Sequence, residues 1–227
     1  MTAWFVVGTD TGVGKTLAAT ALLHRLRTRH ARVAGMKPIA AGAEQQADGR
    51  WTNADVLALQ AAASVRAPDA LVNPYLLKTP ASPHIAARHD GITIEIERIV
   101  SAFQQLRAQA DAVIVEGAGG LLVPLDDEHD GGDLAVALGL PVILVVGLRL
   151  GCLNHALLTA QAIRQRGLPL AGWVANRIDP GMPEVDANLS WLAHRLATPC
   201  LGEIPHLPAP DAREAARFLR LPDEPIA

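Results

Sequence analysis

Short runs of consecutive apolar residues alternate along the chain with longer segments in which apolar residues recur every three or four positions. Continuous apolar runs are typical of strands that are buried on both faces of a sheet. The longer segments have the period of helices that pack one face against such a sheet. The expected strands are 4–7, 33–36, 112–115, 141–146, 170–175 and 199–204. The expected helices are 15–29, 53–63, 94–109, 154–166 and 184–197.

More than 20 residues separate each of these strands from the next, which is enough for a helical crossover. We therefore expect an α/β fold, with a mostly parallel central sheet and helices on both faces. No internal repeat or linker divides the chain, so residues 1–227 are expected to form one domain, with a tail that frays after about residue 218. The segments 40–51 and 125–132 lack either period, and we expect surface loops there, either of which is a candidate lid.

Composition narrows the class of protein. Half of the 227 residues are hydrophobic, which suffices for one sizeable core, and the net charge of −3 gives no basic face for nucleic acid. The chain starts without a signal-peptide pattern and has no apolar run of membrane-spanning length, so a cytoplasmic protein with no membrane partner is expected. Cys152 and Cys200 form no metal-binding motif, and the sequence leaves open whether they are reduced or paired.

The clearest chemical motif is GTDTGVGKT at 8–16, between the first expected strand and the first expected helix. This is the setting of a phosphate-binding loop, in which glycines let backbone amides at a helix start approach phosphate oxygens. In such a loop Lys15 reaches the β- and γ-phosphates and the Thr16 hydroxyl ligates Mg²⁺. The strict pattern has glycine at position 9, where this chain has threonine.

A Mg²⁺ ion at such a loop usually takes a carboxylate from the end of a neighbouring buried strand. Glu116 directly follows the expected strand 112–115, and the GAGG at 117–120 would let a ligand lie against the backbone. Asp55 is a second candidate, although an acidic residue in the first turn of a helix also simply complements the helix dipole. The sequence therefore predicts a site for ATP and Mg²⁺.

An ordered series of segments resembles the dethiobiotin synthetase family and extends to about residue 207. The matching segments are GTDT at 8–11, VGKT at 13–16, GMKP at 35–38, VEGAGG at 115–120, VVG at 145–147, LGCLNH at 150–155, GWVAN at 172–176 and GEIP at 202–205. The resemblance implies a P-loop NTPase fold and an ATP-dependent cyclo-ligase of biotin biosynthesis. It also implies Mg²⁺ as cofactor and a homodimer.

In the implied reaction, the ureido ring of dethiobiotin is closed from 7,8-diaminononanoate, CO2 and ATP. One amine forms a carbamate with CO2, and the carbamate oxygen attacks the γ-phosphate to give a carbamic–phosphoric mixed anhydride. The second amine then attacks the carbonyl carbon and expels phosphate.

The resemblance also implies roles for individual positions. Lys15 and Lys37 would be catalytic, flanking the phosphoryl group and the carbamate and neutralising the charge that develops there. The metal ligands would be Thr16, Asp55 and Glu116. The contacts to the diamine substrate would come from Lys37, Ala41, Gly151, Cys152 and Asn154. The nucleotide would contact Gly12, Val13, Gly14, Lys15, Thr16, Leu17, Asp55, Glu116, Gly117, Ala118, Gly119, Asn176, Arg177, Pro205, His206 and Leu207.

Several of these positions also have a purely structural interpretation. Lys37 could be an exposed strand end, Asn176 a turn residue, and 151–155 a simple helix start rather than a carboxylate site. The chain departs from some family members at Gly12, where they carry an acidic residue. It departs again at Ala41, where some carry a serine whose hydroxyl would add a hydrogen bond worth about 0.5–1.5 kcal/mol.

The main alternative function is a P-loop ATPase switch of the partitioning type. Those proteins carry a signature lysine in the pattern KGGxGKT, at the position of Asp10 in this chain. A glutamine-dependent amidating synthetase would need a second domain, for which the length leaves no room. A nucleotide-binding module without chemistry does not account for Lys37 and Glu116. A requirement of ATP hydrolysis for both a diamine and bicarbonate discriminates among these hypotheses.

Overall fold

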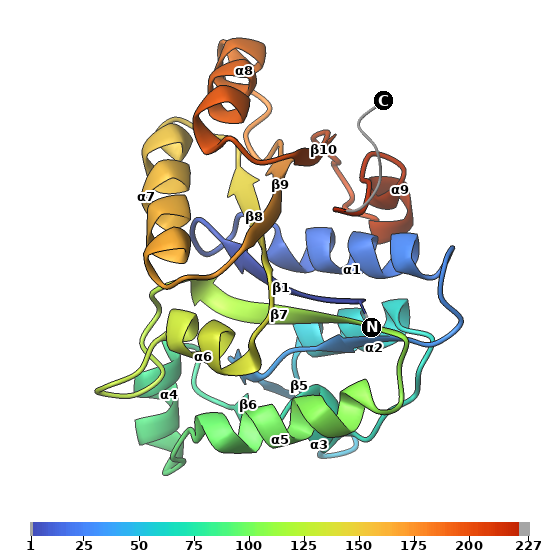
Figure 1. Cartoon of the computed structure of the whole chain (residues 1–227). Coiled ribbons are helices and arrows are strands. Elements are labelled where there is room, and N and C mark those ends of the chain that lie inside the picture. The colour runs from blue at the N-terminus through green and yellow to red at the C-terminus, as the bar shows by residue number, and fades with distance from the viewer. Residues whose placement is uncertain (1, 223–227) are drawn as a thin grey trace.

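A six-stranded parallel sheet forms the centre of the computed structural model, which describes residues 2–222 (Figure 1). The strand order is β10-β9-β8-β1-β7-β2, and every neighbouring pair is parallel. The strands of this sheet are β1 (Thr2–Gly8), β2 (Val33–Met36), β7 (Ala112–Gly120), β8 (Val142–Gly147), β9 (Leu170–Asn176) and β10 (Cys200–Ile204). The α/β fold expected from the hydrophobic pattern is confirmed.

Helices cover both faces of the sheet (Figure 1). One face carries α1 (Lys15–Leu26), α2 (Ala54–Ala62) and α9 (Ala212–Ala216). The helices of the opposite side are α3 (Asp69–Val72), α4 (Pro83–Asp90), α5 (Ile96–Arg107), α6 (Gly131–Leu138), α7 (Cys152–Gln165) and α8 (Val185–Leu196). None of the helices in residues 2–222 combines the length and the apolar character that a membrane span requires.

The continuous apolar strands follow from this two-sided cover. Successive side chains of a strand point to opposite faces of the sheet. In β1, Trp4 and Val6 therefore join the apolar cluster beneath α1, whereas Phe5 and Val7 join the cluster beneath α5, α6 and α7. Because neither face is solvated, each of these positions must be apolar.

The topology places a crevice at the carboxyl ends of the central strands. From β1 the chain crosses to the edge strand β2, whereas β8 lies on the other side of β1, so the direction of winding changes at β1. Ligands of open α/β sheets bind at such a switch point. The register aligns Val6 with Glu116, and Gly8 with both Gly120 and Val145, so the phosphate loop and Glu116 meet at this edge.

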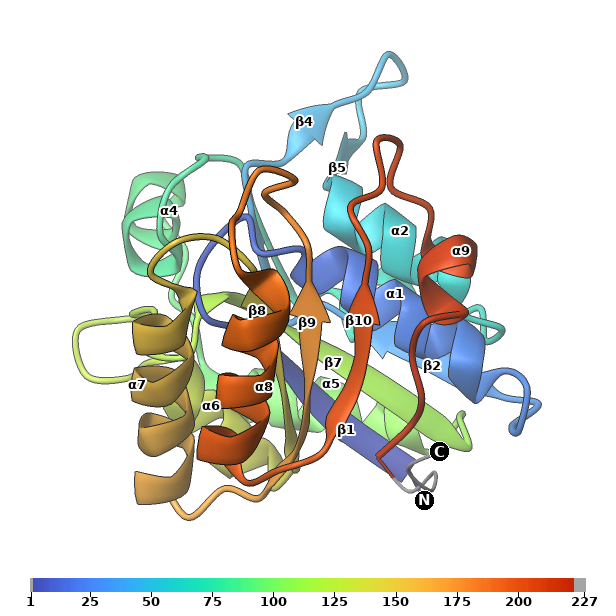
Figure 2. The same ribbon diagram turned by 90° about the horizontal axis from the view of Figure 1, so that it is seen from above.

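Two small sheets lie outside the central one. β3 (Ile39–Ala41) pairs with β6 (Tyr75–Leu77), and β4 (Glu44–Gln45) pairs with β5 (Trp51–Thr52). The expectation of an irregular segment at 40–51 is therefore wrong for the strand residues, whereas its exposure at 44–51 agrees with a surface position. Strands of two residues are too short to show an alternating pattern, so the hairpin is invisible in the sequence. Figure 2 shows this hairpin projecting on the side toward which the arrows of β9 and β10 point.

Several helices and strands begin or end at other residues than the sequence pattern predicted. α1 ends at Leu26, and the next three residues form turns instead of extending the helix to 29. β7 continues past the expected end at 115 as far as Gly120. The expected loop 125–132 contains the start of α6, where Asp130 forms a capping box with Asp133.

The end of the chain also differs from expectation. Leu219 and Leu221 are buried against the α1 face of the sheet, so the expected fraying after about 218 is wrong for these residues. The rest of the tail, 223–227, lies outside the described residues. Cys152 and Cys200, whose state the sequence left open, are both free.

Candidate active site

The phosphate loop joins β1 to α1, and Gly14 is the N-cap of that helix. Gly14 has φ +85°, a conformation that L side chains rarely adopt. A Cβ atom at this position would lie 2.1 Å from Asn176 Nδ2, so a side chain here would displace the Asn176 amide as well as strain the backbone. Gly12 also has a positive φ, of +74°, but faces open space.

Four side chains from four different segments converge beside this loop. Lys37 Nζ lies 2.7 Å from Glu116 Oε1 and 3.1 Å from Asp55 Oδ2. Thr16 Oγ1 lies 2.8 Å from Asp55 Oδ1 and 2.9 Å from Glu116 Oε1. Lys37 follows β2, Glu116 lies in β7, and Asp55 and Thr16 open α2 and α1, so the sheet and two helix starts fix the cluster.

Burial makes the charges of this cluster depend on one another. Glu116 is fully buried, and Lys37 is 4% exposed. Burial raises the pKa of Glu116 above its usual value, against the attraction of Lys37. Burial alone would lower the pKa of Lys37, but the carboxylates of Glu116 and Asp55 raise it. The pKa of Asp55 is lowered, because Lys37 and the Thr16 hydroxyl outweigh the effect of its burial.

The oxygen atoms of Thr16, Asp55 and Glu116 fit a small divalent cation. Neighbouring oxygens around octahedral Mg²⁺ lie about 2.9 Å apart, close to the separations seen here. The single hydroxyl proton of Thr16 cannot fully satisfy two carboxylates, and Glu116 Oε2 is buried without a hydrogen-bond partner. Among residues 2–222 no group of three or more His, Cys, Asp or Glu side chains forms a metal cage. Two carboxylates and a hydroxyl leave coordination positions for phosphate oxygens.

Lys15 occupies the other side of the loop. It is 7% exposed, and its Nζ donates a hydrogen bond to the Asp10 carbonyl at 2.9 Å. Burial and the neighbouring charge of Lys37 lower the pKa of Lys15 to about 8. Two buried cations therefore flank the space in front of the loop, where they suit a ligand with several negative charges.

A second group of expected residues lies at the carboxyl ends of β9 and β10. Asn176 Nδ2 donates to the Val13 carbonyl at 2.9 Å, which brings Asn176 against the phosphate loop. The Arg177 amide donates to the Ile204 carbonyl at 3.0 Å, so Pro205, His206 and Leu207 continue beside it. The Arg177 side chain is paired with Glu203 and Asp186.

The expected contacts to the substrate lie in two places. Ala41 accepts a hydrogen bond from Asn53, the N-cap of α2, at 3.2 Å and is thus close to the Asp55 helix start. Gly151, Cys152 and Asn154 form the start of α7. The Cys152 side chain is buried, and its amide donates to the Arg149 carbonyl at 3.0 Å. The turn before α7 therefore already uses the Cys152 amide.

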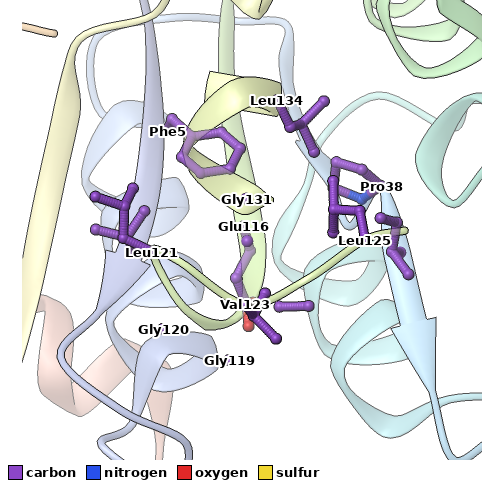
Figure 3. Close-up of a pocket in the computed structure, with 14 residues that line it drawn as sticks. Phe5, Pro38, Glu116, Gly119, Gly120, Leu121, Val123, Leu125, Gly131 and Leu134 are labelled. Carbon is purple, nitrogen blue, oxygen red and sulfur yellow. The ribbon is translucent and has the colours of Figure 1, made fainter. Parts of the chain in front are cut away.

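Two features were not predicted from the sequence. One is an ion pair between Asp10 in the phosphate loop and Arg149 before α7, which are 139 positions apart and meet only because β8 lies beside β1. The other is an apolar pocket against Glu116. Figure 3 shows Phe5, Pro38 and Leu134 at its walls. The remaining apolar side chains that line this pocket are Val7, Ile39, Ala118, Leu121, Val123 and Leu125. Such walls exclude water and strengthen the electrostatic interactions of the buried charges.

Known proteins resemble this chain over almost its full length. The model of a family described as an AAA domain matches residues 2–214. The ATP-dependent dethiobiotin synthetase BioD of Aromatoleum aromaticum is 56% identical over 220 residues, which cover 97% of each chain.

Solved structures add a comparison of fold. The MinD cell division protein of Aquifex aeolicus has a TM-score of 0.56 at 15% identity and covers 96% of this chain and 95% of its own. A ParA family ATPase of Chlorobium tepidum TLS has a TM-score of 0.55 at 15% identity and covers 91% and 84%. At such identities the likeness shows the fold alone, and the expected P-loop NTPase fold is confirmed.

The chain therefore resembles the solved structures in fold only, but resembles the synthetase in sequence as well. The fold is shared with MinD and the ParA family ATPase, whereas a relative at 56% identity is a dethiobiotin synthetase, as the ordered motifs predicted. The chain belongs to the family of ATP-dependent dethiobiotin synthetases.

Proposed function

We propose that this protein closes the ureido ring of dethiobiotin from 7,8-diaminononanoate and CO2 at the expense of ATP, in biotin biosynthesis. Membership of the synthetase family supports an ATP-dependent ligase. The observation that carries the proposal is the position of Lys37. Its ammonium is buried beside Glu116 and Asp55, within the same crevice as the Lys15 ammonium.

The phosphate loop would bind the triphosphate of ATP. Its amides at the start of α1 and the ammonium of Lys15 provide positive charge for the β- and γ-phosphates. Asn176 and the segment that contains Pro205, His206 and Leu207 would bind the base, beside the loop. Thr16, Asp55 and Glu116 would hold Mg²⁺, directly or through water. The bound ion would supply positive charge that offsets the charge of the phosphates during transfer.

In the proposed reaction the protein would act mainly by stabilising negative charge on the reacting oxygens, rather than by transferring protons. One amine of the substrate adds to CO2, and the resulting carbamate oxygen attacks the γ-phosphorus while ADP leaves. The second amine then attacks the carbonyl carbon of the mixed anhydride, the bond to the phosphate oxygen breaks, and the ureido ring closes. Lys37 and Lys15 would stabilise the oxyanions of the carbamate and of the phosphoryl group. Removing one such contact typically lowers a rate by about 10²–10³.

The carboxylate of the substrate would lie at the start of α7, where helix amides favour an anion. With the Cys152 amide already bonded, the amides that follow it, including that of Asn154, are the candidates. Ala41 would lie beside the diamine end, near Asp55.

We further propose that the protein is a homodimer that associates through the surface around α7. Leu150, directly before α7, is 90% exposed. Leu158 on α7 and Leu122 after β7 are more than half exposed and line one groove. Apolar side chains exposed to this extent on one surface are typical of an interface. The two free cysteines fit a reducing compartment, and we place the reaction in the cytoplasm.

The proposal is tested by phosphate release from ATP and Mg²⁺, with the diamine and bicarbonate added separately and together. Release that requires both supports carbamate-linked ring closure. Release without the diamine would instead indicate an ATPase switch, and the proposed function would be wrong.

A further inference from the structure

The phosphate loop and the start of α7 are joined by the side chains of Asp10 and Arg149. Arg149 Nη2 lies 2.5 Å from Asp10 Oδ2. The other carboxylate oxygen, Oδ1, accepts a hydrogen bond from the Thr11 amide at 2.7 Å. Asp10 thus holds the backbone of its own loop with one oxygen and Arg149 with the other.

Both partners are connected further by backbone groups. The Arg149 carbonyl accepts a hydrogen bond from the Cys152 amide, the first of α7, at 3.0 Å. The amide of the preceding Leu148 donates to the Asn176 carbonyl at 2.7 Å. On the other side, the Asp10 carbonyl accepts the bond from Lys15 Nζ. A continuous path of direct contacts therefore leads from the first turn of α7 to the ammonium of Lys15.

A contribution to folding stability does not by itself explain the ion pair between Asp10 and Arg149. The side chains of Arg149 and Asp10 are 42% and 46% exposed, and ion pairs at such exposure contribute little to folding. A comparable arginine–aspartate pair, Arg32 and Asp111, lies at the opposite edge of the sheet, where the strands begin. That second pair is therefore a matched control away from the crevice.

We propose that Arg149 is a positioning residue for the ATP-dependent ring closure. Through Asp10 it fixes the phosphate loop, and with it Lys15, relative to the first turn of α7. This inference rests on the proposed function, in which Lys15 meets the phosphates and α7 meets the carboxylate of the substrate. The phosphates of ATP and the carboxylate of the substrate are then held at a fixed distance from each other. Misplacing reacting groups by about 1 Å can lower a rate by about 10²-fold.

The test compares Arg149→Ala, Arg149→Lys and Asp10→Asn with Arg32→Ala as a matched control. The measurements are kcat, KM for ATP and for the diamine, the dissociation constant of a non-hydrolysable ATP analogue, and the melting temperature. Arg149→Ala should lower kcat/KM about tenfold and weaken the binding of the analogue, while its melting temperature stays with that of Arg32→Ala. Arg149→Lys should recover most of the loss.

Two further comparisons separate positioning from a general defect. The double variant Asp10→Asn/Arg149→Ala should be no worse than the poorer single variant, because both act through one contact. The penalty of Arg149→Ala should be smaller for 2,3-diaminononane, which has a methyl group in place of the carboxylate. Kinetics and analogue binding equal to those of Arg32→Ala, or losses that add in the double variant, would overturn the proposal. A wild-type protein that binds the analogue but forms no ring would contradict the proposed function, and analogue binding by the Arg149 variants would still test the inference.

Discussion

Asn176 donates a hydrogen bond from Nδ2 to the carbonyl of Val13 at 2.9 Å and thereby fixes the end of β9 to the phosphate loop, 163 positions earlier in the chain. The contact is made over Gly14, whose missing side chain leaves the space that the Asn176 amide fills. The loop therefore owes its shape to a distant strand as well as to its own glycines.

Gly14→Ala should destabilise the protein more than Gly12→Ala does. Both glycines have positive φ, which costs an alanine about 1–2 kcal/mol, but only at position 14 does a Cβ meet Asn176. Urea unfolding of both variants measures the difference. Adding Asn176→Ala should recover part of the extra loss at position 14. Equal losses at the two positions would contradict the packing argument.

Lys37→Met should abolish turnover, with a loss of at least about 10² in kcat, while the fold remains. The variant should also be less stable, because it leaves the buried Glu116 carboxylate without its cation, a change that typically costs about 3–5 kcal/mol. Lys37→Met/Glu116→Gln should regain stability but not turnover. Near-normal product formation by Lys37→Met would exclude a catalytic role for this lysine.

Glu116→Gln should raise the Mg²⁺ concentration needed for nucleotide binding by about tenfold or more. The amide keeps the shape of the side chain but removes the charge that would face the ion. A titration of Mg²⁺ at fixed ATP gives the shift, and Glu97→Gln on the exposed side of α5 is the control for the substitution itself. An unchanged titration would count against Glu116 as a metal ligand.

The affinity for ATP should fall as the pH rises above about 8. The pKa of Lys15 is lowered to about 8, and phosphate binds the protonated ammonium, so the free protein loses its binding-competent form above that pH. The dissociation constant should be insensitive to this group below pH 8 and rise by up to about tenfold per unit above it. Lys15→Arg, which stays charged, should remove this dependence. A constant affinity of the wild type between pH 7 and 9.5 would refute the assignment.

If the protein forms the dimer proposed above, Leu158→Asp should convert it into monomers, because the substitution puts a charge on the apolar surface at α7. Light scattering at several protein concentrations gives the mass. Leu57→Asp, on α2 at the opposite face of the sheet, is the matched control and should leave the dimer intact. A monomeric wild type would show that the exposed leucines serve another purpose.

The parts of the fold that were predictable are those whose signals are local. The strand that is now β8 is entirely apolar and entirely buried, so its sequence could hardly form anything else. The β4–β5 hairpin and the short helices α3 and α9 are too brief to show a period. The start of α6 was missed because its capping residue, Asp130, stands within a run of acidic residues that also suits a solvated loop.

The same distinction applies to the site. Lys15 and Thr16 lie within one motif, and Glu116 is indicated by a strand followed by glycines. The pairing of Asp10 with Arg149 depends on β8 lying beside β1, which no local pattern contains. The lowered pKa of Lys15 was equally out of reach, because it arises from burial and from the proximity of Lys37 in space.

The central claim is that ATP cleavage is coupled to the capture of CO2 in a ring. It is tested most directly with ¹³C-bicarbonate, 7,8-diaminononanoate, Mg²⁺ and ATP, by following ADP and the ¹³C signal of the product together. The account predicts one labelled ureido carbonyl for each ADP formed, and no ADP when either the diamine or bicarbonate is left out. ADP that accumulates without a labelled ureido carbon would contradict it.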